Sequence, residues 1–138
     1  MKRIEKYIPL AINVIDDLIL KEQNIVAPEW DNCVANFGAA IRQTGLLTAV
    51  TAFSQESDRS TVSKKAMMHY LLRIIRVADG KMCDINDQLL PIVQQNPHDK
   101  MLKHQITDAA IAMKLALRLF IDNPDKLLIM EETEDDDE

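Results

Sequence analysis

Residues 32–55 read NCVANFGAAIRQTGLLTAVTAFSQ, and the rest of the chain has to be fitted around this stretch. Arg42 is its single charged side chain, while acidic residues stand on both flanks. Exposing so apolar a stretch would leave a large apolar patch in water, so we expect most of it to be buried. Apolar residues recur at helical spacing at Trp30, Val34, Phe37 and Ile41. Gly45 falls where a helix C-cap is expected, so the stretch predicts two helices joined at Gly45.

Two residues of this stretch do not suit a simple apolar helix. Gly38 lies inside the helical pattern, where glycine costs about 1 kcal/mol relative to alanine. Because Ala39 and Ala40 stand beside it, we attribute Gly38 to the close approach of another helix. Arg42 has two interpretations: its side chain reaches the surface as an ordinary snorkelling or paired arginine, or it makes a functional contact.

The composition predicts an all-α protein with one domain. The chain has 138 residues, of which 47% are hydrophobic and only 4% aromatic, so the core must be aliphatic. Three glycines and five prolines leave little turn chemistry for β-hairpins, and no strand pattern is evident. We expect a single-domain antiparallel helical bundle of about six helices.

Helical periodicity and capping residues give the expected order of the helices. The first covers residues 2–21, where Pro9 either kinks the helix or marks its true start, and the second follows Pro28. A third helix runs from Leu46 to Phe53, and a fourth, capped by Ser60 or Thr61, ends at Asp79-Gly80. A fifth begins at Asp84 or Asn86 and continues through Val93. The longest begins at the cap Asp99 and ends before Asn123-Pro124.

The charge of the chain is divided unevenly along its length. Its formal net charge is −6, but residues 131–138 hold seven acids and no base. Without them, residues 1–130 have 15 acids and 16 bases, a net charge of +1. We therefore expect a helical bundle domain over residues 1–130 and an acidic, disordered C-terminal tail over 131–138. Two roles for this tail remain open: it keeps the free protein soluble, or it competes weakly for basic surfaces.

The sequence argues against export, membrane insertion and enzymatic activity. Glu5, Lys6, Asp16 and Asp17 interrupt any signal-like hydrophobic run, and no run approaches the ~18 apolar residues of a membrane span. Cys33 and Cys83 form no CxxC motif, and the sequence leaves open whether they are near each other. No P-loop, calcium loop or HExxH motif is present, and His69, His98 and His104 are scattered. We expect a cytoplasmic, non-enzymatic protein without cofactor or metal.

Two rows of basic residues are the strongest candidates for a binding surface. At 100° per residue, four residues of the fourth predicted helix fall within about 80° of one another: Lys65, His69, Arg73 and Arg76. Four residues of the last helix fall within about 60°: Lys100, Lys103, Lys114 and Arg118. Like charges so spaced repel by a few tenths of a kcal/mol, and phosphate is the natural compensating partner. A row of charge is also typical of a plain solvated face, so both interpretations stay open.

The segment FGAAIRQTGLL at Phe37–Leu47, together with MKRIEKYIPLA at the N-terminus, resembles the small helical subunit of the type III-B CRISPR RNA-targeting effector complex, the Cmr complex. The resemblance covers about the first third of the chain. It implies an all-helical, non-nuclease subunit that stacks in a few copies beside the backbone subunits and helps line the channel for target RNA. The positions that match the family segment are Phe37, Gly38, Ile41, Arg42, Gln43, Gly45 and Leu46. The resemblance implies Arg42 and Gln43 as candidates for contact with RNA or with another subunit.

These observations lead to two alternative functional hypotheses. The first is a structural subunit of an antiviral ribonucleoprotein that holds target RNA through sequence-independent phosphate contacts, with Lys65, Arg73 and Arg76 facing the target strand. Its partners would be guide RNA and target RNA, the backbone and large subunits, and further copies of itself. The second is a helical protein–protein adaptor without direct RNA contact.

Overall fold

The computed structural model describes residues 2–21, 25–55 and 62–122, without the side chains of Lys2 and Arg3. These residues contain no β-strand, which confirms the predicted all-α class. The elements are α1 (Lys2–Glu5), α2 (Ile8–Val14), the π-helix η1 (Ile15–Leu20), α4 (Glu29–Thr44), α5 (Leu46–Phe53), α6 (Lys64–Ala78), α7 (Leu89–Gln95) and α8 (Lys100–Asp122). Since η1 directly continues α2 and α1 is a single turn, six helices in this part of the chain are longer than one turn. No helix among the described residues combines the length and apolar character needed to cross a bilayer.

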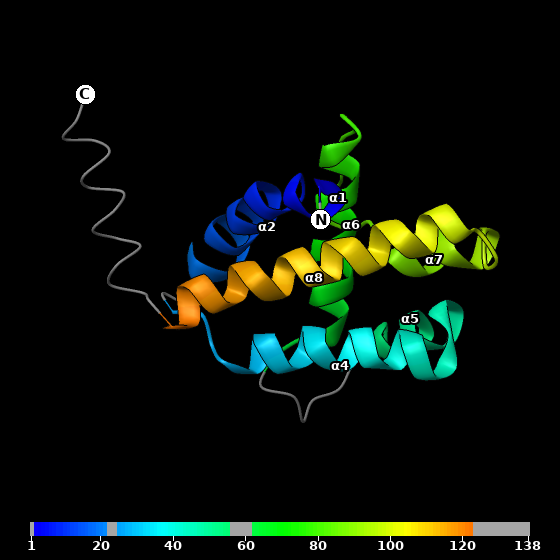
Figure 1. Cartoon of the computed structure of the whole chain (residues 1–138), viewed down its shortest axis with the longest axis horizontal. Coiled ribbons are helices and arrows are strands. Elements are labelled where there is room, and N and C mark those ends of the chain that lie inside the picture. The colour runs from blue at the N-terminus through cyan, green and yellow to red at the C-terminus, as the bar shows by residue number, and fades with distance from the viewer. Residues whose placement is uncertain (1, 22–24, 56–61, 123–138) are drawn as a thin grey trace.

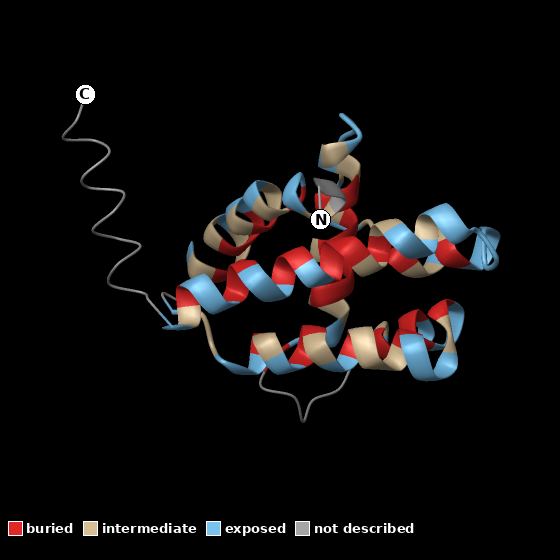
Figure 2. Cartoon of the chain, in the orientation of Figure 1, coloured by how far each residue is buried: buried red, intermediate tan, exposed pale blue. Residues whose placement is uncertain are grey.

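Helix α8 lies at the centre of the structure. Helix α4 lies along one side of α8 and runs in the opposite direction, α2 lies on the other side, and α6 crosses behind them (Figure 1). The antiparallel order expected from the sequence therefore describes α4 and α8, whereas α6 takes a different direction. Figure 2 shows buried residues along the inward sides of these helices and exposed residues on their outer sides.

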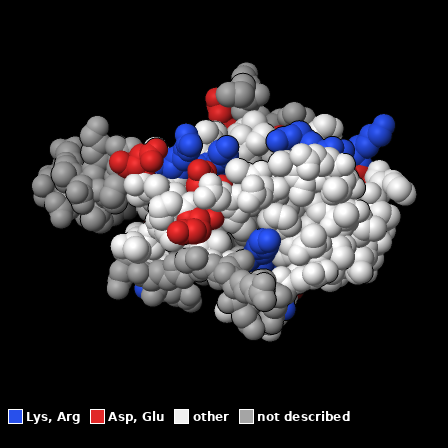
Figure 3. All heavy atoms as spheres, turned by 90° about the horizontal axis from the view of Figure 1, so that it is seen from below, with Lys and Arg blue, Asp and Glu red and all other residues white. Residues whose placement is uncertain are grey.

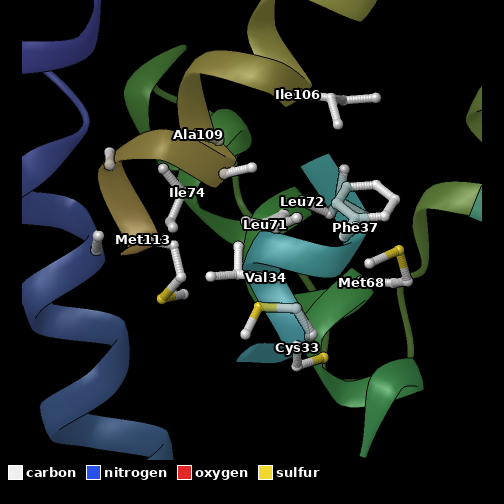
Figure 4. Packing of buried hydrophobic residues seen from close by; sticks show 14 of the residues in the cluster. Cys33, Val34, Phe37, Met68, Leu71, Leu72, Ile74, Ile106, Ala109 and Met113 are labelled. Atoms are coloured by element: carbon white, nitrogen blue, oxygen red, sulfur yellow. The ribbon is translucent and has the colours of Figure 1, made fainter. Parts of the chain in front are cut away.

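The core is aliphatic and is formed mainly where α4, α6 and α8 meet (Figure 4). Val34 and Phe37 from α4, Leu71 and Ile74 from α6, and Ala109 and Met113 from α8 are all buried. The Phe37 ring is fully buried, and its centroid lies 5.2 Å from that of Phe53 on α5. This contact joins α4 and α5 across the connection at Gly45.

Two of the predicted helix boundaries are confirmed by their capping geometry. An Asp99 carboxylate oxygen accepts the backbone N–H of Leu102 at 3.1 Å and caps the start of α8. Gly45 ends α4 with φ +92°, a region that L residues rarely adopt, and its N–H donates to the Ile41 carbonyl at 2.9 Å. The chain can therefore turn directly from α4 into α5.

Two predicted helix starts need correction. Helix α6 is capped by Ser63, whose hydroxyl accepts the Ala66 N–H at 3.0 Å, and Ser60 and Thr61 lie outside the described residues. Helix α7 begins at Leu89, several residues after the predicted start at Asp84 or Asn86. Here the backbone and side chain of Asp87 bond back to Asp84, at 3.0 Å each, and close a turn that competes with helix formation. Pro91 consequently falls in the first turn of α7, where its missing N–H has no intrahelical partner.

The predicted N-terminal helix is divided into three parts. It breaks after α1, and α2 then begins at Ile8, which places Pro9 at its second position, within the tolerated first turn. The wider π turns of η1 continue α2 to Leu20. Of the two alternatives for Pro9, the structure thus favours a helix start, one residue earlier than predicted.

The expectation that most of residues 32–55 are buried is wrong. Only eight are buried: Cys33, Val34, Phe37, Ile41, Leu46, Ala49, Val50 and Phe53. The exposed positions are mostly asparagine, glutamine, threonine and alanine, which cost little in water because they are polar or small. Figure 3, which views the α4–α5 side, shows a broad area without charge in the right half of the view, with charged side chains at the left, in the lower middle and along the upper edge.

Both cysteines are free thiols, and they lie near opposite ends of α6. Against the larger effect of burial, the charge of Lys64, the first residue of α6, lowers the pKa of the Cys33 thiol. The charges of Arg73 and Arg76, near the end of α6, act in the same way on the pKa of Cys83. The 12 helical steps from Lys64 to Arg76 span about 18 Å, so the two thiols do not face each other.

Cys33 predicts a loss of stability at alkaline pH. Burial raises the pKa of its thiol from 9.0 to about 11, so the unfolded chain ionises first as the pH rises. The free energy of unfolding should therefore fall by up to about 2 kcal/mol between pH ~9 and ~11. Urea unfolding at a series of pH values measures this loss. The C33A variant should lose less stability over the same range, and an unchanged slope would contradict the assignment.

Candidate nucleic-acid interface

The predicted basic row on α6 is largely enclosed. Lys65, Arg73 and Arg76 are half-buried, and His69 is only 6% exposed. The row borders two adjoining hollows between α6 and the α2–η1 helix, with volumes of about 300 and 220 Å³. Leu18 of η1 lines both hollows, and Ile85 from the segment after α6 closes one side of the larger.

Hydrogen bonds hold the middle of this α6 row in place. His69 Nδ1 lies 2.7 Å from the Asp87 carbonyl oxygen, which can only accept, so Nδ1 carries a proton and donates. The Arg73 guanidinium, at 3.4 Å, then donates from Nη2 to Nε2 of the same ring. His69 and Arg73 therefore link α6 to the turn at Asp87. These two residues of the predicted binding row thus stabilise the fold.

The basic row on α8 is exposed along its whole length: Lys100, Lys103, Lys114 and Arg118. Arg118 Nε lies 3.7 Å from Asp31 Oδ2 near the start of α4. This ion pair shows that the row lies on the side of α8 that faces α4. Because the Arg118 side chain is 62% exposed, the pair contributes only about 0–1 kcal/mol, and Arg118 can exchange the carboxylate for a phosphate.

Arg42 joins the α8 row from the neighbouring helix. Asp31 and Arg42 are 11 residues apart on α4, which places them about 20° apart around the helix and about 16 Å apart along it. Since α4 and α8 are antiparallel (Figure 1), Arg42 is level with about residue 107 of α8, between Lys103 and Lys114. We call the combined set the seam band: Arg42, Lys100, Lys103, Lys114 and Arg118.

The seam band is a strip of positive charge about 27 Å long, the rise of the helix from Lys100 to Arg118. Figure 3 shows Lys and Arg along the upper edge of the view, with Asp and Glu among them at the left end. Among the described residues, Asp31 is the carboxylate that forms an ion pair with the band. Arg42 also stands in the last turn of α4, where a cation interacts favourably with the helix dipole.

The other residues that match the family segment divide into core and surface. Phe37, Ile41 and Leu46 are buried and stabilise the fold, whereas Gln43 is exposed. Gly38 does not allow the close approach of another helix, contrary to the prediction. A Cβ atom built at Gly38 would meet only the Arg42 side chain, with Nη1 at 3.8 Å.

Gly38 therefore predicts a stabilising substitution. The G38A variant should raise the free energy of unfolding by about 0.5–1 kcal/mol, because it removes the helix-interior cost of glycine at ordinary contact distance. Urea unfolding of the isolated protein measures the change. A destabilised variant would show that α4 packs more closely here than the described contacts indicate.

Two buried polar residues, Tyr7 and Asp108, lie close to each other and to the exposed Asp79, an arrangement that was not apparent from the sequence. Burial, followed by the charges of Asp79 and Asp108, raises the pKa of Tyr7, which is only 1% exposed. Asp108 on α8 is itself only 7% exposed. A tyrosine held protonated in this way is a poor base, so the arrangement is suited to joining helices. Among the described residues, no group of three or more His, Cys, Asp or Glu side chains could hold a metal ion.

The seam band could have been found only in part from the sequence. The angular spacing on one helix finds Lys100, Lys103, Lys114 and Arg118, but Arg42 joins them only through the packing of α4 on α8. The chain matches no protein-family model, no curated protein and no solved structure.

Proposed function

We propose that this chain is the non-catalytic small subunit of a type III-B CRISPR ribonucleoprotein, where it holds target RNA through phosphate contacts during antiviral defence in the cytoplasm. The observation that carries the proposal is the seam band, an exposed basic strip with a single carboxylate in an ion pair among the described residues. The resemblance of residues 1–11 and 37–47 supports the choice of this complex. Its partners would be guide RNA and target RNA, the backbone and large subunits, and further copies of the chain.

The chemistry of the seam band favours contact with the sugar-phosphate backbone. Lysines follow a strand as point charges, and arginines can bind a phosphate through two hydrogen bonds. At about 3.4 Å per stacked nucleotide, the 27 Å strip would follow roughly eight nucleotides. Such contacts are independent of sequence, which suits a target that is selected by base pairing with a guide.

Base stacking is not supported by the aromatic residues of the described regions. Trp30 is 2% exposed, and its ring packs 5.7 Å from that of the half-buried Tyr70. Phe37 and Phe53 are paired in the core. We therefore assign the main contact to the seam band, and a secondary contact, at most, to Lys65, Arg73 and Arg76 of the α6 row.

Charge reversal in the seam band tests this function. The K103E/K114E variant should bind a fluorescein-labelled oligouridylate about tenfold more weakly, because two phosphate contacts become repulsive. The slope of log affinity against log salt should also fall by about 1.4, at roughly 0.7 for each single-strand phosphate. Fluorescence anisotropy over a range of salt concentrations measures both, and filter binding repeats the comparison on the assembled complex.

The matched control is K6E/K81E, which makes the same change in net charge at two exposed lysines outside the seam band. Its RNA affinity should stay within about twofold of the unchanged protein, since long-range effects between exposed charges are screened. If both variants lose affinity equally, binding follows net charge alone and the seam band is not the site.

The adaptor function remains the second candidate because of the uncharged α4–α5 surface. Exposed threonine, asparagine and glutamine side chains can be covered by a protein at little electrostatic cost. If the adaptor hypothesis is correct, K103E/K114E prevents co-purification with partner subunits, while the RNA affinity of each intact complex is unchanged.

A further inference from the structure

A ridge of three aliphatic side chains runs beside the seam band on α8. Ile111, Leu115 and Leu119 are four residues apart and are 41%, 47% and 41% exposed. They lie about 20–100° around the helix from Arg118, on the side away from α4. Single exposed aliphatics are normal, but a helix of an isolated domain usually carries polar residues over its whole outer side. The exposed side of α8 is thus part apolar and part positive.

We propose that this composite side of α8 binds the chain's own C-terminal segment, residues 123–138. Helix α8 ends at Asp122, and the sequence continues NPDKLLIMEETEDDDE. An apolar block, Leu127–Met130, comes first, and the seven acids of residues 131–138 follow it. A chain that turned back along α8 from Asp122 would meet the apolar ridge first and then Lys103 and Lys100. This order matches the tail, in which the apolar block comes before the acids.

The lengths of the two partners also agree. Residues 123–126, which include Asn123 and Pro124, provide a turn signal for reversing the chain. In extended form the four residues Leu127–Met130 span about 13 Å, and the ridge from Leu119 to Ile111 is about 12 Å long. Eight further residues reach up to about 26 Å, enough to pass Lys103 and Lys100.

Charge and tethering favour this segment over a second copy of the chain. Two chains with a formal net charge of −6 repel each other, whereas within one chain the negative charge lies at the tail and the seam band is positive. A short tether also gives an effective concentration in the millimolar range. A bound tail would cover lysines of the seam band and compete with RNA there, a consequence that rests on the proposed function. The docking itself does not.

Carbodiimide crosslinking of the full chain tests the docking without RNA, because it joins a lysine amine directly to a carboxylate in contact with it. Mass spectrometry of the monomer band should show residues 131–138 joined to Lys103 and Lys100 at least threefold more often than to Lys81, an exposed lysine elsewhere. This preference should disappear near 1 M NaCl, where charges are screened within about 3 Å. Equal crosslinking to Lys81, or crosslinks found only in a dimer band, would overturn the proposal.

A second measurement follows the apolar part of the contact. In the L128S/I129S variant the methyl NMR signals of Ile111, Leu115 and Leu119 should shift, while those of Leu47, an exposed leucine on α5, should not. Unchanged ridge signals would also overturn the docking.

Replacing the seven tail acids by Gln and Asn tests the competition with RNA. Affinity for the oligouridylate should rise about tenfold if three or so exposed ion pairs are released. If the crosslinks show docking but RNA affinity does not rise, the tail does not compete with RNA, and the docking still stands. Failure of K103E/K114E to weaken RNA binding would instead remove the proposed function and leave the docking in place.

Discussion

Replacing Phe37 with alanine is expected to lower the free energy of unfolding by about 3–5 kcal/mol. The ring is 0% exposed and lies where side chains of α4, α6 and α8 converge (Figure 4). Its removal leaves a cavity and also takes away the contact with Phe53, whose ring centroid is 5.2 Å away. Because domains of this size are stable by about 5–15 kcal/mol, the variant should unfold at much lower urea concentration.

Equilibrium urea unfolding, followed by far-ultraviolet circular dichroism, measures this loss. The control is L47A, at a leucine of α5 that is 38% exposed and should cost less than about 1 kcal/mol. Equal losses in the two variants would show that Phe37 is not at the centre of the core.

Replacing Gly45 with alanine should cost about 2 kcal/mol, the second largest effect expected on stability. Gly45 has φ +92° and ψ 166°, a region of backbone space that is essentially restricted to glycine. No atom lies within 4 Å of an added Cβ, so the cost comes from the backbone conformation and not from a clash. The direct connection from α4 to α5 depends on this conformation.

The same substitution at Gly38, seven residues earlier, provides the matched comparison. G38A replaces a glycine inside α4 and G45A the glycine that caps its end, and they should change the free energy of unfolding in opposite directions. Equal signs would mean that the α4–α5 connection is not held at Gly45 as described.

The fold class was predictable because it depends on local rules. The spacing of apolar residues reports which face of a helix is buried, and this identified α4, α6 and α8. Asp99 and Gly45 were recognised because an N-cap needs a side-chain acceptor and a positive φ favours glycine.

The errors arose where contacts between distant residues decide the structure. Asp84 and Asp87 bond to each other instead of starting a helix, and this turn then receives His69 from α6. The sequence around Gly38 suggested tight packing of helices, but only the three-dimensional structure reveals that the space beside it is taken by Arg42.

The candidate site was predictable to the level of single helices. Angular spacing shows which bases share a face, but it cannot show whether that face meets solvent or another segment. The two rows look alike in the sequence, but in the structure the α6 row is half-buried or buried and the α8 row is exposed. Arg42 was a candidate because it is the single charged side chain of residues 32–55 and lies in the family segment. Its place beside Lys103 and Lys114 follows only from the antiparallel packing of α4 on α8.

The buried position of Trp30 gives the domain its own optical reporter. Its indole is the single tryptophan of the chain, and its emission should depend on the contact between α4 and α6 that Tyr70 completes. Trp30 is about 22 Å along α4 from Gly45, so emission and dichroism sense separate places during denaturation. Coincident transitions from the two signals would establish that the helices melt as one cooperative unit.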